Sequence, residues 1–310
     1  MQALISSVLL LASILKICTS SESDWCYQTQ VECGSSSCKG PDVWHEVNEQ
    51  CSKSRQSPIN IVTKKTKLNH LLTPLKFTGY QEAFRSTLKN NGHSVTITVP
   101  HVATVSEGNL LNTYRAVQFH FHWGKDGGPG SEHTVDGEQY PMEMHIVHMR
   151  QDFKNLDAAL GDPTGVAVLG FFYEESASSN RKYDGFIEAL KNVVESGSNT
   201  TIDGISLSNL IPSEGNMTNY YRYSGSLTTP SCTEAVVWTV FENPIPLSHD
   251  QLSAFSKLKF HGGKSMVKTF RPVQPRKGRV VYRSGSSVLL ASFTLLLLCV
   301  TSALGLSQFN

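Results

Sequence analysis

Three histidines at strand-like spacing are the residues of this chain best suited to chemistry. His120 and His122 lie in the run QFHFHW at 118–123, and His145 lies in the run EMHIVH at 143–148. Three imidazoles form a ligand set that Zn²⁺ accepts with its fourth tetrahedral position open, and an open position permits catalysis. Because neutral ligands leave the full charge on the metal, a bound water would be acidified.

The two runs must lie side by side for these rings to meet. Apolar and polar residues alternate in both runs, and the segment between them is rich in glycine, which is typical of two antiparallel strands joined by a loop. Side chains two apart share a strand face, so Gln118 points with His120 and His122, and Glu143 points with His145. These two neighbours could hold the second ring nitrogens, as metal-ligating imidazoles require.

A polar strand face is the plainer interpretation of a His-x-His pair. His133 and His148 are further histidines that could be mistaken for ligands. What favours the metal site is the presence of the two polar neighbours just described.

Length and composition describe an ordinary globular chain that begins with a secretory signal. The 310 residues carry a formal charge of +1 and are 39% hydrophobic, so no basic excess suggests a nucleic-acid partner. Residues 1–20 resemble a signal peptide, with an apolar core followed by small residues. Residues 21–283 contain no repeat, charge run or long linker, and this predicts one domain.

The C-terminal segment 284–310 has no charged residue and is apolar for long enough to cross a bilayer. Small residues at 284–286 before this tail match a glycosylphosphatidylinositol (GPI) signal and predict lipid attachment at Ser284, with removal of the tail. A single transmembrane anchor is the alternative, although no Lys or Arg follows the tail. The predicted location is the extracellular face of the plasma membrane.

The cysteines between signal and tail are five in number, namely Cys26, Cys33, Cys38, Cys51 and Cys232. In an oxidising compartment we expect two disulfides and one leftover thiol, and the residues alone leave the pairing open. A cysteine zinc site is the alternative, but no CxxC spacing supports it. Sequons at Asn199 and Asn216 predict surface glycans.

Strand signals outnumber helix signals along the domain. Strands are expected at 75–78, 94–99, 116–123, 142–149, 166–173 and 235–241. The runs 166–172 and 236–240 are almost wholly apolar, which favours central strands. Helices are expected from Asp184 as a cap to about 195, and at 251–258 after a Ser248–Gln251 capping box. Residues 26–58 lack periodicity and are expected to wrap the surface rather than build the core.

Six motifs spread over nearly the whole domain resemble those of the alpha-class carbonic anhydrases, and most closely their lipid-anchored members. They are RQSPINI at 55–61, NNGH at 90–93, QFHFHW at 118–123, GSEHTVDG at 130–137, EMHIVH at 143–148 and GSLTTP at 225–230. The resemblance implies an α+β, sheet-dominated single domain with a large, twisted, mostly antiparallel sheet and short peripheral helices. It also implies one Zn²⁺, held by His120, His122 and His145, and reversible hydration of carbon dioxide to bicarbonate by attack of zinc-bound hydroxide.

The resemblance assigns further roles. Thr228 would accept the hydrogen bond of the hydroxide, and Glu132 would take the proton of Thr228. His93 would carry the released proton to solvent, since an imidazole of ordinary pKa suits that task. The substrate-binding positions that the resemblance implies are Val147, Val168, Leu227, Thr228, Thr229, Val236 and Trp238. Asn91 and Gln118 would lie with Thr229 on a polar wall that orders water. From the residues alone, the apolar positions are equally well core, and His93 in its Asn-Gly turn is better explained as a plain exposed histidine.

The same resemblance implies the disulfides Cys26–Cys38 and Cys51–Cys232. Cys33 has no counterpart in the family and could compete with Cys38 for Cys26. We expect a monomer that acts on carbon dioxide and bicarbonate, with bicarbonate transporters as conceivable partners. One alternative is an inactive relative that serves as a binding module, but such a relative is expected to lack a ligand. The other is a zinc peptidase, which the absence of an HExxH motif disfavours.

Overall fold

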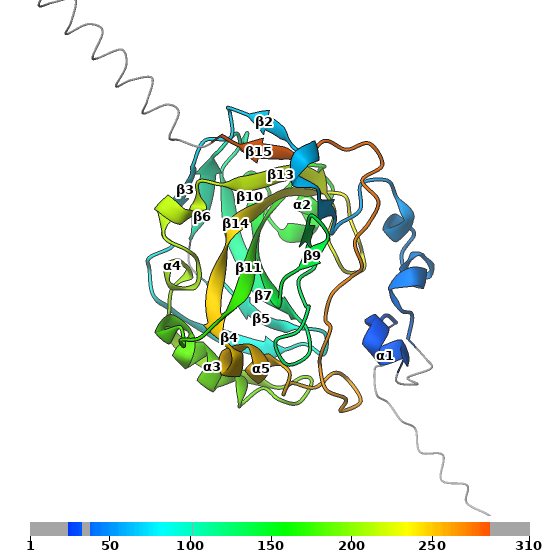
Figure 1. Ribbon diagram of the computed structural model, residues 1–310, viewed down its shortest axis with the longest axis vertical. Helices are drawn as coiled ribbons and strands as arrows, with labels where there is room; N and C mark the ends of the chain where they lie inside the picture. Colours follow the sequence, from blue (N-terminus) through cyan, green and yellow to red (C-terminus); the bar gives the residue numbers. More distant parts are fainter. Residues whose placement is uncertain (1–23, 33–37, 101, 286–310) are drawn as a thin grey trace, which may run out of the picture.

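The computed structural model describes residues 24–32, 38–100 and 102–285. Its main element is a 12-stranded sheet with the strand order β12-β4-β5-β7-β10-β11-β14-β13-β15-β2, in which β6 pairs with β7 and β3 pairs with β6 (Figure 1). The strands of this sheet are β2 (Lys67–Asn69), β3 (Leu75–Thr78), β4 (Phe84–Asn90), β5 (Val95–Thr98), β6 (Thr104–Glu107), β7 (Tyr114–Trp123), β10 (Met142–Arg150), β11 (Val166–Ser176), β12 (Asn199–Ile205), β13 (Tyr220–Gly225), β14 (Val236–Ser248) and β15 (Tyr282–Ser284). A small second sheet consists of β1 (Asn60–Ile61), β8 (Thr134–Val135) and β9 (Glu138–Gln139).

The large sheet is mostly antiparallel, as expected. Only the pairs β11–β14 and β15–β2 are parallel among its described strands. All six predicted strands are present, and five of them agree with their predicted ends within three residues. The sixth, β14, runs seven residues past its predicted end at 241. The structure adds strands such as β4, β12 and β13, which lack a clear alternating pattern. The predicted α+β, sheet-dominated fold is confirmed.

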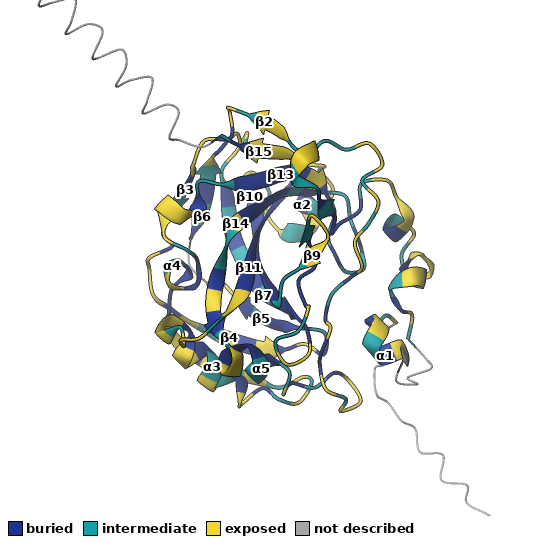
Figure 2. Ribbon diagram, in the orientation of Figure 1, coloured by how far each residue is buried: buried dark blue, intermediate teal, exposed yellow. Residues whose placement is uncertain are grey.

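The central strands are buried on both faces, and this explains their continuous apolar runs. All residues of β10 except the last are buried, and so are the first eight residues of β11, as the dark blue ribbons of Figure 2 show. Ile146 and Leu169 pack into the larger of two core clusters, whereas Val147 and Val168 pack into the smaller one. Since successive strand residues point to opposite faces, the sheet separates the two clusters.

The helices are short and peripheral, as predicted. They are α1 (Gln28–Glu32), α2 (Leu156–Leu160), α3 (Asp184–Leu190), α4 (Leu207–Leu210) and α5 (His249–Phe255). The Ser248–Gln251 capping box at α5 is confirmed. Asp184 is the first residue of α3 rather than its cap, and α3 ends five residues earlier than expected. The side chain of Asn90 donates to the carbonyls of Val193 and Val194 at 3.1 and 3.2 Å, so these groups are bound from outside instead of within a longer helix.

The segment 26–58 departs from its prediction. It runs outside the sheet, along the side of the molecule that carries α1 (Figure 1), but it also contributes to the core. Tyr27 is 1% exposed and Trp44 is fully buried, and both belong to the larger core cluster. The prediction that this segment builds no core is therefore wrong for these two aromatic residues, because two large rings can be buried without any regular period.

Two disulfides tie this segment down, and both match the pairing implied by the resemblance. Cys26 bonds to Cys38, and Cys51 bonds to Cys232, which lies 181 residues further along the chain. Cys33 lies outside the described residues.

The two bridges should differ in their contribution to stability because they close loops of very different length. The Cys51–Cys232 bridge closes the longer loop, with a sequence separation of 181. Removing it with Cys51→Ser and Cys232→Ser should lower the free energy of unfolding by about 5 kcal/mol in the chain-entropy model. Removing the 12-residue bridge with Cys26→Ser and Cys38→Ser should cost about 3 kcal/mol. Urea unfolding of both double variants measures the difference, and a larger loss for the shorter loop would contradict it.

Candidate metal centre

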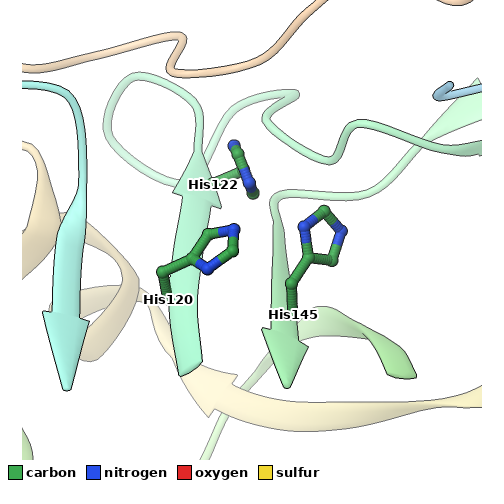
Figure 3. Close-up of side chains that lie close together, drawn as sticks. All are labelled: His120, His122 and His145. Carbon is green, nitrogen blue, oxygen red and sulfur yellow. The ribbon is translucent and has the colours of Figure 1, made fainter. Parts of the chain in front are cut away.

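Three imidazole rings converge where β7 and β10 pair (Figure 3). The register places His120 opposite His145 and His122 opposite Glu143, so all four side chains lie on one face. One nitrogen from each of His120, His122 and His145 lies within 4.8 Å of the other two. The face predicted from the spacing of these residues is therefore confirmed.

Each ring is held through its other nitrogen. Gln118 Oε1 lies 3.0 Å from Nδ1 of His120, and Glu143 Oε1 lies 2.8 Å from Nε2 of His145. The backbone carbonyl of Thr269 lies 2.7 Å from Nδ1 of His122. Gln118 and Glu143 were expected in these places. Thr269 was missed, because any residue type can supply a carbonyl and no sequence pattern marks it.

The three rings are in the state that metal binding requires. Burial lowers the pKa of His122 to about 3 and holds the pKa values of His120 and His145 below their ordinary range, so the rings are neutral at neutral pH. The Nε2 atom of His122 is buried and has no hydrogen-bond partner. A buried polar atom without a partner is costly unless something binds it. The donor set and this atom fit a metal ion such as Zn²⁺.

Glu143 organises the groups behind the ligands. Its Oε2 accepts hydrogen bonds from the backbone nitrogens of Glu132 and His133, at 2.9 and 2.8 Å. Its Oε1 accepts from the ring nitrogens of His133 and His145. Burial alone would raise the pKa of Glu143, but these two histidines hold it well below its usual range. The carboxylate therefore stays ionised and orients His145.

Glu132 is a second buried carboxylate, close to the ligands. Its Oε1 accepts a hydrogen bond from the backbone nitrogen of Arg271 at 2.8 Å. The hydroxyl of Thr228 also hydrogen-bonds to the Glu132 side chain. Its Oε2 lies 3.4 Å from Nε2 of His122 and has no hydrogen-bond partner. Burial raises the pKa of Glu132, against the opposing effect of Thr228 and the backbone of Arg271. Thr228 and Glu132 thus meet beside the ligand nitrogens, as the resemblance implies.

An apolar row lies next to the ligand row on the same face. Val147, Val168 and Trp238 are direct cross-strand neighbours on β10, β11 and β14. The Trp238 ring centroid is 4.8 Å from that of His145. Val236 is fully buried in the same cluster, and Leu227 packs against it. The structure therefore brings all five expected apolar residues into one cluster, in which Trp238 contacts the ligand His145.

A cavity of about 160 Å³ reaches two of the ligands, His120 and His122. Its lining includes the expected polar residues, namely Asn91, His93, Gln118 and Thr229. It also includes Trp25, Tyr27 and Thr96, which the sequence did not mark as site residues. Tyr27 was missed because it belongs to the segment 26–58, which was expected to wrap the surface, and Trp25 directly precedes that segment.

His93 packs against one of these missed residues. Its ring stacks on Trp25 with centroids 3.8 Å apart and planes 10° apart. Burial in this stack, with His261 nearby, lowers the pKa of His93 to about 4. Its Nδ1 has no hydrogen-bond partner, so no hydrogen bond through that atom holds the ring in place.

The other two histidines do not belong to the ligand set. His133 lies between Glu143 and the Tyr223 hydroxyl, with ring nitrogens 2.7 Å from each. His148 lies 2.6 Å from the Tyr80 hydroxyl, and its other nitrogen faces the carbonyl of Ile146. Both ring nitrogens of each residue are occupied.

A mixed, mostly antiparallel sheet that carries three neutral imidazoles, with a threonine–carboxylate pair beside them, defines a mononuclear metalloenzyme. Residues 39–285 match the family described as eukaryotic-type carbonic anhydrase, and the chain belongs to this family. It is a carbonic anhydrase, a lyase that hydrates carbon dioxide, and His120, His122 and His145 are its zinc-site triad.

Several curated proteins are similar over most of their length. Carbonic anhydrase 4 of Rattus norvegicus is 39% identical over 88% of this chain and 89% of its own. Carbonic anhydrase 4 of Oryctolagus cuniculus is 40% identical over 89% of both chains. Carbonic anhydrase 6 of Homo sapiens is 39% identical over 77% of this chain and 78% of its own.

Proposed function

We propose that the protein hydrates carbon dioxide outside the cell with one Zn²⁺ ion held by His120, His122 and His145. The observation that carries this proposal is the meeting of three neutral ring nitrogens, one of them buried without a partner. With three neutral ligands, Zn²⁺ supplies a Lewis acid that makes water a nucleophile at neutral pH. Stopped-flow hydration of carbon dioxide by the zinc-loaded protein tests the proposal. Hydration at the uncatalysed rate would refute it.

The residues around the ligands orient the three imidazole rings and the attacking oxygen. Gln118, Glu143 and the Thr269 carbonyl hold the three rings, so each presents its free nitrogen to one point. Thr228 donates its only hydroxyl proton to Glu132, so its oxygen can only accept from a nucleophile. The hydrogen of the attacking oxygen then points at Thr228, and a lone pair is left for carbon dioxide.

The apolar row provides the place for the uncharged substrate. Val147, Val168 and Trp238 offer no hydrogen-bonding group toward the ligands, since the Trp238 Nε1 donates to the carbonyl of Ser226 at 3.0 Å. Carbon dioxide has no charge and can enter such a site without losing strong hydration, whereas bicarbonate cannot. This difference favours release of the product toward the polar cavity that Asn91, Gln118 and Thr229 line.

His93 is our candidate for the proton carrier, and it must move to serve. In the stack on Trp25 its pKa of about 4 makes it a weak base for a proton released near neutral pH. Contact with solvent would return its pKa toward about 6.5. Since Nδ1 has no partner among the described residues, moving the ring breaks no hydrogen bond through that atom, and the stacking on Trp25 opposes the movement.

Replacing His93 with alanine should slow turnover by about tenfold or more in dilute buffer, because water is a poor proton acceptor at neutral pH. Added imidazole should restore the rate. His261→Ala is the matched control, since the His261 ring lies 6.1 Å from that of His93. A slow His261 variant beside a normal His93 variant would move the carrier role to His261.

The proposed extracellular location is supported by the two disulfides. The predicted signal peptide and almost all of the C-terminal tail lie outside the described residues, and no helix in the described part is long and apolar enough to cross a membrane. Ser284, our candidate for lipid attachment, is 6% exposed in β15, and its hydroxyl donates to the carbonyl of Thr218 at 2.8 Å. A lipid attached there would join the anchor directly to a strand of the sheet. Asn199 and Asn216 are both exposed, which keeps them candidates for glycosylation.

A phosphatidylinositol-specific phospholipase should release hydration activity from intact cells that express the full chain, because the proposed anchor is a lipid on the outer face. A fusion that replaces residues 284–310 with a known spanning helix is the matched control and should stay bound. If the full chain resists release under conditions that free another lipid-anchored protein, the transmembrane alternative is favoured.

A further inference from the structure

Four exposed apolar side chains, which we call the apolar edge, lie at the end of the large sheet that β2 and β15 form. Leu68 lies in β2 and Tyr282 in β15, two strands that pair at the top of the molecule in Figure 1. Leu71 follows β2 by two residues, and Leu111 lines one cavity together with Asn69 of β2 and Tyr282. Seven large apolar residues are exposed in the described part of the chain, so more than half of them are at this end.

The apolar edge is large and carries charge beside it. Leu111 is 85% exposed and Leu71 is 66% exposed. In the pairing of β2 with β15, Leu68 lies opposite Arg283, and Tyr282 lies opposite Lys67. Since successive strand residues point to opposite faces, each face of this pair presents one apolar side chain and one cation. Single exposed apolar residues are common, whereas a group of them rimmed by charge marks a surface that binds a protein or a membrane.

The two chain segments that build this end are basic. Residues 62–81 contain four lysines, residues 273–285 contain one lysine and three arginines, and neither segment contains Asp or Glu. Neighbouring elements add Glu107, Asp136 and Glu242, of which the last two already accept hydrogen bonds from hydroxyl groups. Lys and Arg beside apolar side chains are typical of a surface that lies among the headgroups of a bilayer, where the cations meet phosphates.

The described chain also ends at the apolar edge. β15 ends at Ser284, our candidate for lipid attachment, which lies opposite Asn69 of β2. A side chain at Gly285, the next residue, would contact the Leu68 side chain at 3.7 Å. The apolar segment 288–306 begins three residues further on, a distance of at most about 10 Å. The membrane attachment therefore starts beside Leu68, whether this segment spans the bilayer or is exchanged for a lipid.

We propose that the apolar edge docks on the outer leaflet of the membrane, with Leu71 and Leu111 at the boundary between headgroups and acyl chains. The lysines and arginines of the two segments lie among the phosphates. The proposal rests on the proposed membrane attachment, of either kind, because the attachment holds this edge against the bilayer. A protein partner would not need to bind at the attachment point, whereas a bilayer always lies there. Docking gives the domain one orientation on the membrane.

Quenching of a dye at the edge by lipid tests the proposal. The zinc-loaded protein is purified from cell membranes with its anchor and reconstituted in phosphatidylcholine vesicles that contain a spin-labelled lipid. The dye is attached at Thr73→Cys, an exposed position two residues after Leu71, in a Cys33→Ser background. Leu71→Glu combined with Leu111→Glu should reduce quenching by at least about threefold, because carboxylates are expelled from the leaflet and lift the edge while the anchor stays in place.

Val31→Glu combined with Val102→Glu is the matched control. These two valines are 38% and 62% exposed, and neither belongs to the apolar edge or to the two basic segments. The control should be quenched like the wild type, and all three proteins should hydrate carbon dioxide equally, since no changed residue belongs to the metal centre.

The outcomes separate docking from attachment. Equal quenching in the wild type and the edge variant, with both proteins in the vesicles, would overturn the docking and leave the attachment standing. An equal loss of quenching in the control would also overturn it, because added negative charge anywhere would then explain the effect. Protein recovered away from the vesicles would refute the attachment, and the docking with it.

Discussion

Alanine at position 120 should abolish both zinc binding and carbon dioxide hydration. His120 supplies one of three ring nitrogens that lie within 4.8 Å of each other, and two imidazoles cannot complete a three-ligand site. Without the metal, the attacking water keeps its ordinary, far higher pKa instead of one of about 7. We therefore expect the rate to fall by at least about four orders of magnitude, to the uncatalysed level.

Metal content and stopped-flow hydration, measured on the same samples, check this result. His249→Ala is the matched control, because His249 is exposed at the start of α5 and its nearest charged partner is the exposed Glu175. The control should bind one zinc ion and hydrate carbon dioxide like the wild type. Hydration by a His120→Ala protein that contains no zinc would show that the chemistry does not depend on this centre.

Alanine at position 143 should damage both stability and metal affinity. Glu143 is fully buried and accepts hydrogen bonds from two backbone nitrogens and two histidine rings. Its removal leaves these donors unpaired in the interior, and we expect the free energy of unfolding to fall by about 3–5 kcal/mol. Because His145 also loses the group that orients it, zinc affinity should fall by about 10–100-fold.

Chemical unfolding of the metal-free protein and zinc competition with a chelator measure the two effects separately. Glu138→Ala is the matched control, since Glu138 is an exposed glutamate in β9. Glu143→Gln keeps the volume but places an amide donor among groups that are already donors, so it should also lose affinity. Wild-type zinc affinity in both Glu143 variants would mean that His145 is held by other contacts.

The ligand set could be predicted from the sequence because it depends on local geometry. Residues two apart in a strand share a face, so the positions of His120, His122 and Gln118 follow from their spacing once the segment is a strand. The same argument places Glu143 beside His145. The glycine-rich loop between the two runs predicts that the strands pair, and the register of β7 and β10 confirms this pairing.

The roles of single polar residues such as Thr228 and Glu132 could not be predicted from spacing alone. Nothing in the residue types of Thr228 and Glu132 links them, since they lie far apart in the chain, and only the family resemblance joined them. The structure brings them together through the loop that precedes β14, which the Cys51–Cys232 bridge ties down. The set of motifs along the chain therefore predicted the pairing of Thr228 with Glu132, which no local pattern predicts.

The available chemistry follows from the residues and their spacing, which place three imidazole rings on one face and two polar residues beside them in a sheet-dominated domain. The distant groups that complete the site follow only from how the chain folds. The Thr269 carbonyl reaches His122 across 147 residues, and Trp25 stacks on His93. Within a strand the backbone sets the direction of each side chain, whereas these contacts depend on how distant segments pack.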